Sequence, residues 1–562
     1  YRFVYRTEER VTEITDSLGN VSYLKYDESQ MVVEEVDALG GVIRYEYDDE
    51  GRTTAVIDQD GRRTEYGYDR YGNLVSLIRP DGQKLTVTYD TEHRPVAITD
   101  FDGTCWRQEW DDCGRLVKRI SPLGMEFRYE YDEFGQPVGF IDPAGAKTTL
   151  EFDKWGNPVR LSDALGHSTE LAYDVLGRVT ERLEPLNRRT VFMYDQKGRL
   201  VRVKKPDGSE LCYAYDAEDN LVTYTDENGA VTKLEYCGVS ELKRRIQPGG
   251  QVVEYHYDTE ERLVALTNQR GERYELERDA LGRIIGETDY WGQKRRYEYT
   301  PAGDLLMSTD PLGRVIRYKT DTLGRIVEKA CVGPEDAADV AVERFEYDVA
   351  GNLTACQNEA IRIERKYDRE GRLVEEAQGD WAVIRYDYDL LGKLTSRTTK
   401  VTKGEAVQTQ TVKYAYDVLG RVNAIELPGH EPIQLVRDAA GRITKEILTG
   451  SLSRYLEYDK VGCLTGQMVL NGEGVLFKQE YEYDRAGNLL TKLDSVFGKE
   501  MFRYDPVGRL ITHFEPEGEV RRYLHDPAGD LLKTEVRSNS DNDGWSREGE
   551  YAGIRYVFDR VG

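Results

Sequence analysis

One stretch near the end of the chain has residue types and spacing that resemble a calcium-binding loop. Asn539, Asp541 and Asp543 alternate before a glycine, and Glu550 follows six residues after that glycine. Oxygen ligands at alternate positions, a glycine for the sharp turn and a late bidentate glutamate are what Ca²⁺ requires. Helices normally flank such a loop, whereas this sequence predicts strands on both sides. We therefore interpret residues 539–550 as an acidic hairpin tip, and we assign no metal ligand.

The other residues that could do chemistry show no ligand or catalytic spacing. The seven cysteines share no position and form no CxxC pair, which disfavours a disulfide framework or a structural zinc site. The six histidines are scattered and are interpreted as ordinary strand and turn residues. Asp and Glu are so abundant that a pair of carboxylates carries no information. The sequence predicts no enzyme, no catalytic residue, no cofactor-binding residue and no cofactor within this chain.

Charge and composition exclude further classes of function. Lys plus Arg number 77 and Asp plus Glu 103, a net charge of −26 that would repel phosphate backbones, so we expect no nucleic-acid binding. The basic runs at 243–245 and 294–296 are short and are interpreted as solvated strand faces. No run approaches the ~20 apolar residues that a membrane-spanning helix needs, and no signal peptide is visible. We expect both ends to be cut from a longer protein.

The elements that would position any site belong to a repeat of 21 residues. A fixed period of this size is typical of arrays in which each unit packs mainly on its neighbours. Ten looser copies follow the regular ones, from Tyr347 to Phe558. The sixteen regular copies carry their marker residue at Tyr5, Tyr26, Tyr47, Tyr68, Tyr89, Trp110, Tyr131, Phe152, Tyr173, Tyr194, Tyr215, Tyr236, Tyr257, Arg278, Tyr299 and Thr320.

Each repeat predicts two short strands and two turns. In the copy that begins at Tyr47, the turn signals are Asp48-x-x-Gly51 and Asp58-x-x-Gly61. Aspartate caps backbone N–H groups at the start of a turn, and glycine tolerates the positive φ that a type I turn with a G1 bulge requires. The remaining residues alternate in polarity and suffice for two strands of six or seven residues. Tyrosines that recur on one face are interpreted as cross-strand ladders rather than as sugar-stacking platforms.

The sequence therefore predicts an all-β fold made of one long antiparallel sheet of hairpins. Roughly 52 strands at ~4.8 Å each would give about 250 Å of sheet, and accumulated twist would wind such a strip into a spiral around a cavity. We expect regular repeats over 1–346 and less regular repeats with loop insertions over 347–562, all in one continuous shell. The register lapses at 320–347, 388–416, 458–483 and 525–558, where we expect lengthened hairpins that project from the sheet.

Read together, the marker and its turn give the motif Y-D-x-x-G-[R/N]-[L/V], as in residues 68–74 and 173–179. This pattern, recurring along essentially the whole chain, resembles the RHS/YD-repeat family, which includes bacterial polymorphic toxins, the C component of insecticidal toxin complexes and the teneurins. The resemblance implies a hollow β-shell that wraps a C-terminal toxin segment until delivery. In bacterial members of the family a protease-like core follows the repeats and cuts off the toxin at an Asp-Pro-x-Gly motif. We do not find that core in this sequence, and we carry over no catalytic residue from the family. The two such motifs here, at 505–508 and 526–529, stand in ordinary turn register, so we interpret both as turns.

The function that follows from the resemblance is a non-enzymatic shell that sequesters a toxin for use against competing bacteria or a host. Its partners would be its own C-terminal toxin segment, which would lie beyond Gly562, and a secretion machinery or chaperone. We expect such a protein to be exported from a bacterium. The alternative is a cell-surface adhesin that binds glycans or proteins through projecting hairpin loops. Choline- or glucan-binding repeats are disfavoured because the chain has only six tryptophans.

Overall fold

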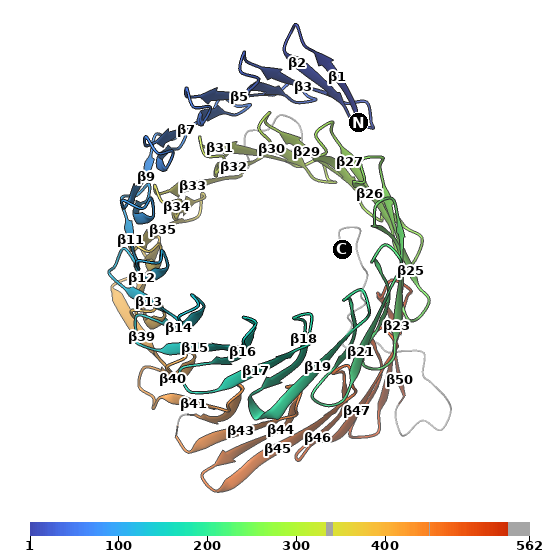
Figure 1. The fold of residues 1–562 in the computed structure, drawn as a ribbon. Helices are drawn as coiled ribbons and strands as arrows, with labels where there is room; N and C mark the ends of the chain where they lie inside the picture. The colour runs from blue at the N-terminus through green and yellow to red at the C-terminus, as the bar shows by residue number, and fades with distance from the viewer. Residues whose placement is uncertain (333–340, 449, 538–562) are drawn as a thin grey trace. The chain divides into compact units, whose positions relative to one another are not determined.

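The computed structural model describes residues 1–332, 341–448 and 450–537, and strands dominate throughout (Figure 1). The described residues form fifty strands of one antiparallel sheet, in which strands that are consecutive in the sequence pair with each other. The three-residue 3-10 helix η1 is the only helix in the described ranges, so none of them holds a helix able to cross a bilayer. The predicted all-β antiparallel fold is confirmed.

The strands of the first half of the chain are β1 (Arg2–Arg6), β2 (Val11–Thr15), β3 (Val21–Tyr26), β4 (Val32–Val36), β5 (Val42–Tyr47), β6 (Thr53–Ile57), β7 (Arg63–Tyr68), β8 (Leu74–Ile78), β9 (Lys84–Tyr89), β10 (Pro95–Thr99), β11 (Cys105–Trp110), β12 (Leu116–Ile120), β13 (Glu126–Tyr131), β14 (Pro137–Ile141), β15 (Lys147–Phe152), β16 (Pro158–Ser162), β17 (Ser168–Tyr173), β18 (Val179–Glu184), then η1 (Pro185–Asn187), β19 (Arg188–Tyr194), β20 (Leu200–Lys204), β21 (Glu210–Tyr215), β22 (Leu221–Thr225), β23 (Val231–Cys237), β24 (Glu241–Ile246) and β25 (Val252–Tyr257).

The second half contains β26 (Leu263–Thr267), β27 (Arg273–Arg278), β28 (Ile284–Thr288), β29 (Lys294–Tyr299), β30 (Leu305–Thr309), β31 (Val315–Thr320), β32 (Ile326–Val332), β33 (Ala341–Tyr347), β34 (Leu353–Gln357), β35 (Arg362–Tyr367), β36 (Leu373–Gln378), β37 (Ala382–Tyr388), β38 (Leu394–Lys403), β39 (Ala406–Tyr416), β40 (Val422–Glu426), β41 (Ile433–Arg437), β42 (Ile443–Ile447), β43 (Leu452–Tyr458), β44 (Leu464–Asn471), β45 (Gly474–Tyr483), β46 (Leu489–Asp494), β47 (Gly498–Tyr504), β48 (Leu510–Phe514), β49 (Val520–His525) and β50 (Leu531–Arg537).

The turns have the predicted geometry, but they are longer than predicted. At the turn after Tyr47, the Gly51 N–H donates to the Asp48 carbonyl at 3.0 Å and the Asp48 N–H donates to the Arg52 carbonyl at 3.0 Å. Gly51 has φ +78°, and the register shifts at Tyr47, as a G1 bulge requires. Because the bulge keeps the residue after glycine in the loop, each turn takes five residues and the regular strands keep five or six, not six or seven.

The turn aspartate holds its loop closed with both carboxylate oxygens. Asp48 Oδ1 accepts from the backbone N–H groups of Glu50 at 3.1 Å and Arg52 at 2.9 Å, while Oδ2 accepts from Arg52 Nε at 2.7 Å. These charge-assisted hydrogen bonds satisfy loop donors that no strand partner reaches. They lower the pKa of Asp48 below its ordinary value, although partial desolvation opposes the shift.

The marker side chain ties each repeat to the one before it. The Tyr194 hydroxyl donates to the Val179 carbonyl at 2.8 Å, fifteen residues earlier. The same bond recurs at Tyr47, Tyr68, Tyr89, Tyr131, Tyr173, Tyr215, Tyr236, Tyr299, Tyr388 and Tyr458. At some markers that are not tyrosine, another donor reaches the equivalent carbonyl, as Trp110, Arg278, Arg437 and His525 do. The marker Phe152 has no side-chain donor for this bond.

In many repeats an arginine at the last position of the turn, after glycine or, for Arg94, after His93, ties its repeat to the next. Arg94 Nη1 donates to the Asp111 carbonyl at 2.8 Å, and Arg442 Nη1 donates to the Asp459 carbonyl at 2.8 Å. The Arg442 guanidinium also lies 4.9 Å from the ring centroid of Tyr458, within cation–π range. The [R/N] position of the motif is therefore a link between repeats as well as part of a turn.

The described sheet has no thick apolar core. Its buried apolar residues are few and mostly small, such as Ala55, Ala265 and Ala355, and no large side chain in the described ranges is fully buried. One face carries half-buried aromatics, where Tyr213 and Tyr224 lie opposite each other on β21 and β22 with ring centroids 5.7 Å apart. The opposite face carries cross-strand ion pairs such as Lys25–Glu34–Arg44. Contacts between neighbouring strands, rather than a packed interior, hold this sheet.

The chain divides into two compact units. Unit 1 comprises Tyr1–Lys147, Tyr257–Ala265 and Tyr274–Val412, and unit 2 comprises Thr148–His256, Leu266–Arg273 and Lys413–Gly562. Two predicted insertions are lengthened hairpins: β38 and β39 have 10 and 11 residues, and β44 and β45 have 8 and 10. Parts of the other two, at 333–340 and 538–562, lie outside the described residues, and so does the acidic segment 539–550.

Removing one marker hydroxyl should weaken the link between two repeats. We expect Tyr194→Phe to lower the free energy of unfolding by about 1 kcal/mol, because the Val179 carbonyl loses a donor while the ring stays in place. Tyr224→Phe is the control, since its hydroxyl has no protein hydrogen bond among the described residues. Chemical denaturation of both variants measures the difference, and equal losses would contradict the assigned role.

Candidate functional site at the seam between distant repeats

Every regular repeat places one turn on each edge of the sheet. We call the turn that follows the marker the marker turn, as at 48–52, and the other the second turn, as at 58–62. In each unit, second turns of the earlier stretch meet marker turns of the later stretch, and we call this line of contact the seam. In unit 1 it brings the blue strands β5–β9 beside the olive strands β30–β34 (Figure 1).

In unit 1 the seam is held by polar contacts between residues far apart in sequence. Arg62 Nη1 lies 2.7 Å from Asp304 Oδ2, and both side chains are about four-fifths shielded from solvent. The Ser17 N–H donates to Glu260 Oε1 at 2.6 Å. Hydrogen bonds from the Ser17 and Tyr1 hydroxyls and the Ser17 N–H bring the pKa of Glu260 down to about 2. The Glu260 carboxylate is therefore held in its charged form.

In unit 2 the seam has the same construction. Arg270 Nη1 lies 2.6 Å from Asp526 Oδ2 and 2.6 Å from Asp530 Oδ2, so one guanidinium bridges two carboxylates of a single marker turn. The Asp526 side chain is only 8% exposed. Its burial opposes ionisation, but the Asp530 N–H and Arg270 together lower its pKa. Farther along the seam, Asn228 Nδ2 donates to Asp484 Oδ2 at 2.9 Å.

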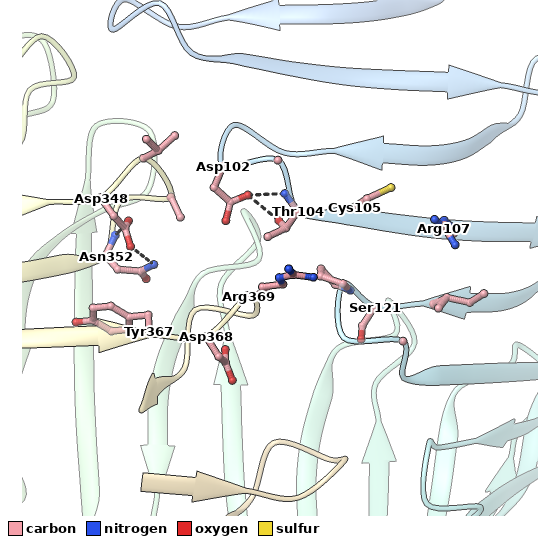
Figure 2. Close-up of a pocket in the computed structure, with 16 residues that line it drawn as sticks. Asp102, Thr104, Cys105, Arg107, Ser121, Asp348, Asn352, Tyr367, Asp368 and Arg369 are labelled. Carbon is pink, nitrogen blue, oxygen red and sulfur yellow. Dashed lines mark hydrogen bonds between the residues drawn. The ribbon is translucent and has the colours of Figure 1, made fainter. Parts of the chain in front are cut away.

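A cavity of about 760 Å³ opens at the seam of unit 1 (Figure 2). It lies between the second turns around Asp102 and Ser121 on one side and the marker turns around Asp348 and Asp368 on the other. A cavity of about 870 Å³ occupies the corresponding place in unit 2, between the turns around Asp226 and those around residues 484–508. The seam therefore alternates between direct ion pairs and polar openings.

The carboxylates that line the cavity in unit 1 are engaged by hydrogen bonds within their own turns. Asp102 Oδ1 accepts from the Thr104 N–H at 2.9 Å and from its hydroxyl at 2.7 Å, and Asp348 Oδ1 accepts from the Asn352 N–H at 2.8 Å. These carboxylates serve their own turns, and the lining pairs no nucleophile with a base. Within the described ranges, no three His, Cys, Asp or Glu side chains are grouped as metal ligands. The arrangement is suited to non-covalent contact.

The motifs that the sequence offered as candidate sites lie in turns and strands of the sheet. The Asp-Pro-x-Gly motifs form ordinary marker turns, as predicted: the Gly508 N–H donates to the Asp505 carbonyl at 3.0 Å and the Gly529 N–H to the Asp526 carbonyl at 3.1 Å. The basic runs lie on β24 and β29, where Arg244 pairs with glutamates of the neighbouring strands. All seven cysteines are free thiols. The seam contacts of Arg62 and Arg270 were not predicted from the sequence.

Two protein-family models match this chain, and several solved structures share its fold. A family model described as RHS Repeat matches residues 47–84, 89–124 and 131–169. A model described as Teneurin YD-shell matches 158–388 and 382–545, more than half of the chain. No curated protein sequence matches significantly.

Two solved structures share the fold. One, titled TcdB2-TccC3-Cdc42, has TM-score 0.62 and 14% identity, and the match covers 93% of this chain and 35% of that one. The other is a TccC3 mutant of the Photorhabdus luminescens Tc holotoxin pore, with TM-score 0.58, 14% identity and coverage of 93% and 34%. The chain thus spans about a third of the length of the chains it matches.

Breaking the bridge in unit 2 should loosen its seam. We expect Arg270→Ala to destabilise β49 and β50 by roughly 2–3 kcal/mol, because it leaves the buried Asp526 carboxylate without its cation. The control is Arg314→Ala, whose pair with Asp310 is exposed at the arginine and should contribute less than about 1 kcal/mol. Native-state hydrogen exchange measures both losses, at the β49–β50 amides for Arg270→Ala and at the β30–β31 amides for Arg314→Ala. Unchanged protection in Arg270→Ala would contradict the role of the bridge.

The seam of unit 1 should weaken in acid. The pKa of Glu260 is lower in the folded chain than its ordinary value of 4.5, so its contribution to stability is present above pH 4.5 and is lost as the pH falls toward 2. The stability difference between the natural chain and Glu260→Gln should therefore shrink over this interval. Denaturant titration from pH 6 to pH 2 measures it, with the exposed Glu218→Gln as control. A difference independent of pH would contradict the assignment.

Proposed function

Because the chain belongs to the RHS/YD-repeat family, whose YD-shell model matches more than half of it, we propose that it forms the wall of a hollow container that sequesters a polypeptide toxin. In this proposal the chain acts by confinement and carries out no chemistry itself. The regular repeats of 1–346 and the less regular repeats of 347–562 contribute to one continuous wall.

The observation that carries the proposal is the seam. Its contacts join residues 242 to 270 positions apart, and they occur in both units with the same pairing of second turns to marker turns. This separation corresponds to about 12 repeats, or ~115 Å of sheet at ~4.8 Å per strand. The sheet is one strand layer thick, and its two edges meet at a nearly constant interval along the chain. We infer that such a sheet winds on itself and so forms a wall.

The cargo that we propose is a C-terminal toxin segment of the same protein, which would follow Gly562. The wall would keep that segment from its targets in the producing bacterium and release it on delivery to a competitor or a host. Export from a bacterium, through a secretion machinery or with a chaperone, belongs to the same proposal. The likeness to the structure of a Tc holotoxin pore supports it at the level of the fold.

A second candidate is an adhesin that binds proteins or glycans through projecting hairpins. The lengthened β38–β39 and β44–β45 hairpins favour it, because their tips carry exposed apolar residues such as Val407 and Val475. In an adhesin, removal of these hairpins would abolish binding to a cell surface. In a container, the same removal would leave cargo protected.

Protection from proteolysis tests the container directly. The full chain would be joined after Gly562 to its natural downstream segment or, as a surrogate, to an unfolded segment of about 100 residues. We expect trypsin to spare the joined segment while the wall is intact, because the enzyme is a folded domain that must enter the enclosed space.

The matched control is the same fusion carrying Arg62→Ala and Arg270→Ala, which removes one ion-pair site from the seam of each unit. Cleavage of the joined segment should be faster in this variant. Equal and rapid cleavage in both proteins would contradict the container, as would a compact solid particle in electron micrographs of the unmodified chain.

A further inference from the structure

The sequence Asn-Gly occurs twice in this chain, and one of the two pairs lies on the seam of unit 2. Asn228 and Gly229 are the third and fourth residues of the second turn at 226–230, and both are exposed. Asn228 Nδ2 donates at 2.9 Å to Asp484 Oδ2, which lies in a marker turn 256 positions later. Asparagine followed by glycine is the sequence in which a side-chain amide is lost most readily. Asn228 is therefore a seam donor with a chemically labile amide.

The loss of this amide needs only the glycine backbone and water. The Gly229 nitrogen attacks Asn228 Cγ, the bond between Cγ and Nδ2 breaks, and Nδ2 leaves as ammonia with the proton from the Gly229 nitrogen. Water then opens the resulting succinimide ring and leaves aspartate or isoaspartate at position 228. Glycine hinders the attack least because it has no Cβ, and the space beside the Gly229 Cα is open.

The closed seam holds the reacting groups apart. The Gly229 N–H donates to the Asp226 carbonyl at 3.0 Å, and Gly229 has φ +83°, as the bulge of a closed turn requires. The Asn228 N–H donates to Asp226 Oδ1 at 3.0 Å, while the Asn228 side chain is held by Asp484. The glycine nitrogen can therefore reach Asn228 Cγ only when the turn opens and the contact with Asp484 breaks. The frequency of this local opening sets the rate of the reaction.

The product would replace an attractive seam contact with a repulsive one. Burial opposes ionisation of Asp484, but hydrogen bonds from Asn488 and Asn228 lower its pKa, so it is a carboxylate at neutral pH. A carboxylate at position 228 would place two like charges where a hydrogen bond now stands. Isoaspartate would also add a methylene group to the backbone of the turn. We propose that Asn228 is a site of spontaneous deamidation, at which the closed seam limits the reaction and the reaction loosens the seam.

Prolonged incubation of the purified full chain in mildly alkaline buffer tests whether the seam limits the reaction. Peptide mapping by mass spectrometry follows deamidation at Asn228 and, in the same sample, at the second Asn-Gly pair, where Asn471 contacts Ser451 of the neighbouring turn. We expect Asp484→Ala to speed the reaction at Asn228 by about fivefold to tenfold, because one hydrogen bond fewer holds the site closed, and to leave Asn471 unchanged. The control is Asp174→Ala, which removes the same cap from a marker turn closed from within. An equal rate at Asn228 in all three proteins would overturn the proposal.

A variant that carries the product tests whether the reaction loosens the seam. Asn228→Asp should speed native-state hydrogen exchange of the amides of 481–491, on either side of the Asp484 turn, by about tenfold, because like charges then face each other across the seam. Asn228→Ala removes the hydrogen bond without adding a charge and should give a smaller change. Asn471→Asp makes the same substitution at the other Asn-Gly pair and should leave these amides unchanged. Exchange in Asn228→Asp that equals exchange in the natural chain would overturn the proposal.

Discussion

The bidentate use of the turn aspartate is the interaction on which the remaining structure depends. One oxygen of Asp48 caps two backbone N–H groups while the other holds Arg52. This closes a five-residue loop with a bulge, and the loop length then sets the strand length and register of each hairpin. The same arginine is the position from which other repeats reach the next turn, as Arg94 reaches the Asp111 carbonyl. Local turn chemistry thus determines how consecutive repeats are joined.

Much of the fold can be predicted from the sequence because its determinants are local. Asp48-x-x-Gly51 specifies a turn, and the alternation around Tyr45 and Tyr47 specifies a strand, without reference to distant residues. The strand length was overestimated because the residue after the glycine was assigned to a strand. The motif also identifies the arginine as a turn residue. It does not indicate the carbonyl to which the arginine donates, because that carbonyl lies in the following repeat.

The residue pairs across the seam could not be predicted, because nothing local to Arg62 identifies Asp304 as its partner. In a chain of similar hairpins, each turn on one edge of the sheet could pair with many similar turns on the other edge. Which turns pair depends on how the whole sheet curves, and no single repeat determines that. One signal was present: marker-turn tips are mostly apolar from Leu281 onward, at Leu323, Leu419 and Val507 among others, where several earlier tips are charged. That change begins close to where the later stretch meets the earlier one, and it could have located the seam.

The marker hydrogen bond has a consequence for how such a chain tolerates mutation. Its acceptor is a main-chain carbonyl, which no substitution can delete, and any side chain with a donor of adequate reach can make the bond. Tyr194, Trp110, Arg278 and His525 all make it with unrelated side chains. Individual copies can therefore drift in sequence without a compensating change elsewhere. Single repeats of such a gene can therefore change in sequence one at a time, while the backbone structure that they encode stays the same.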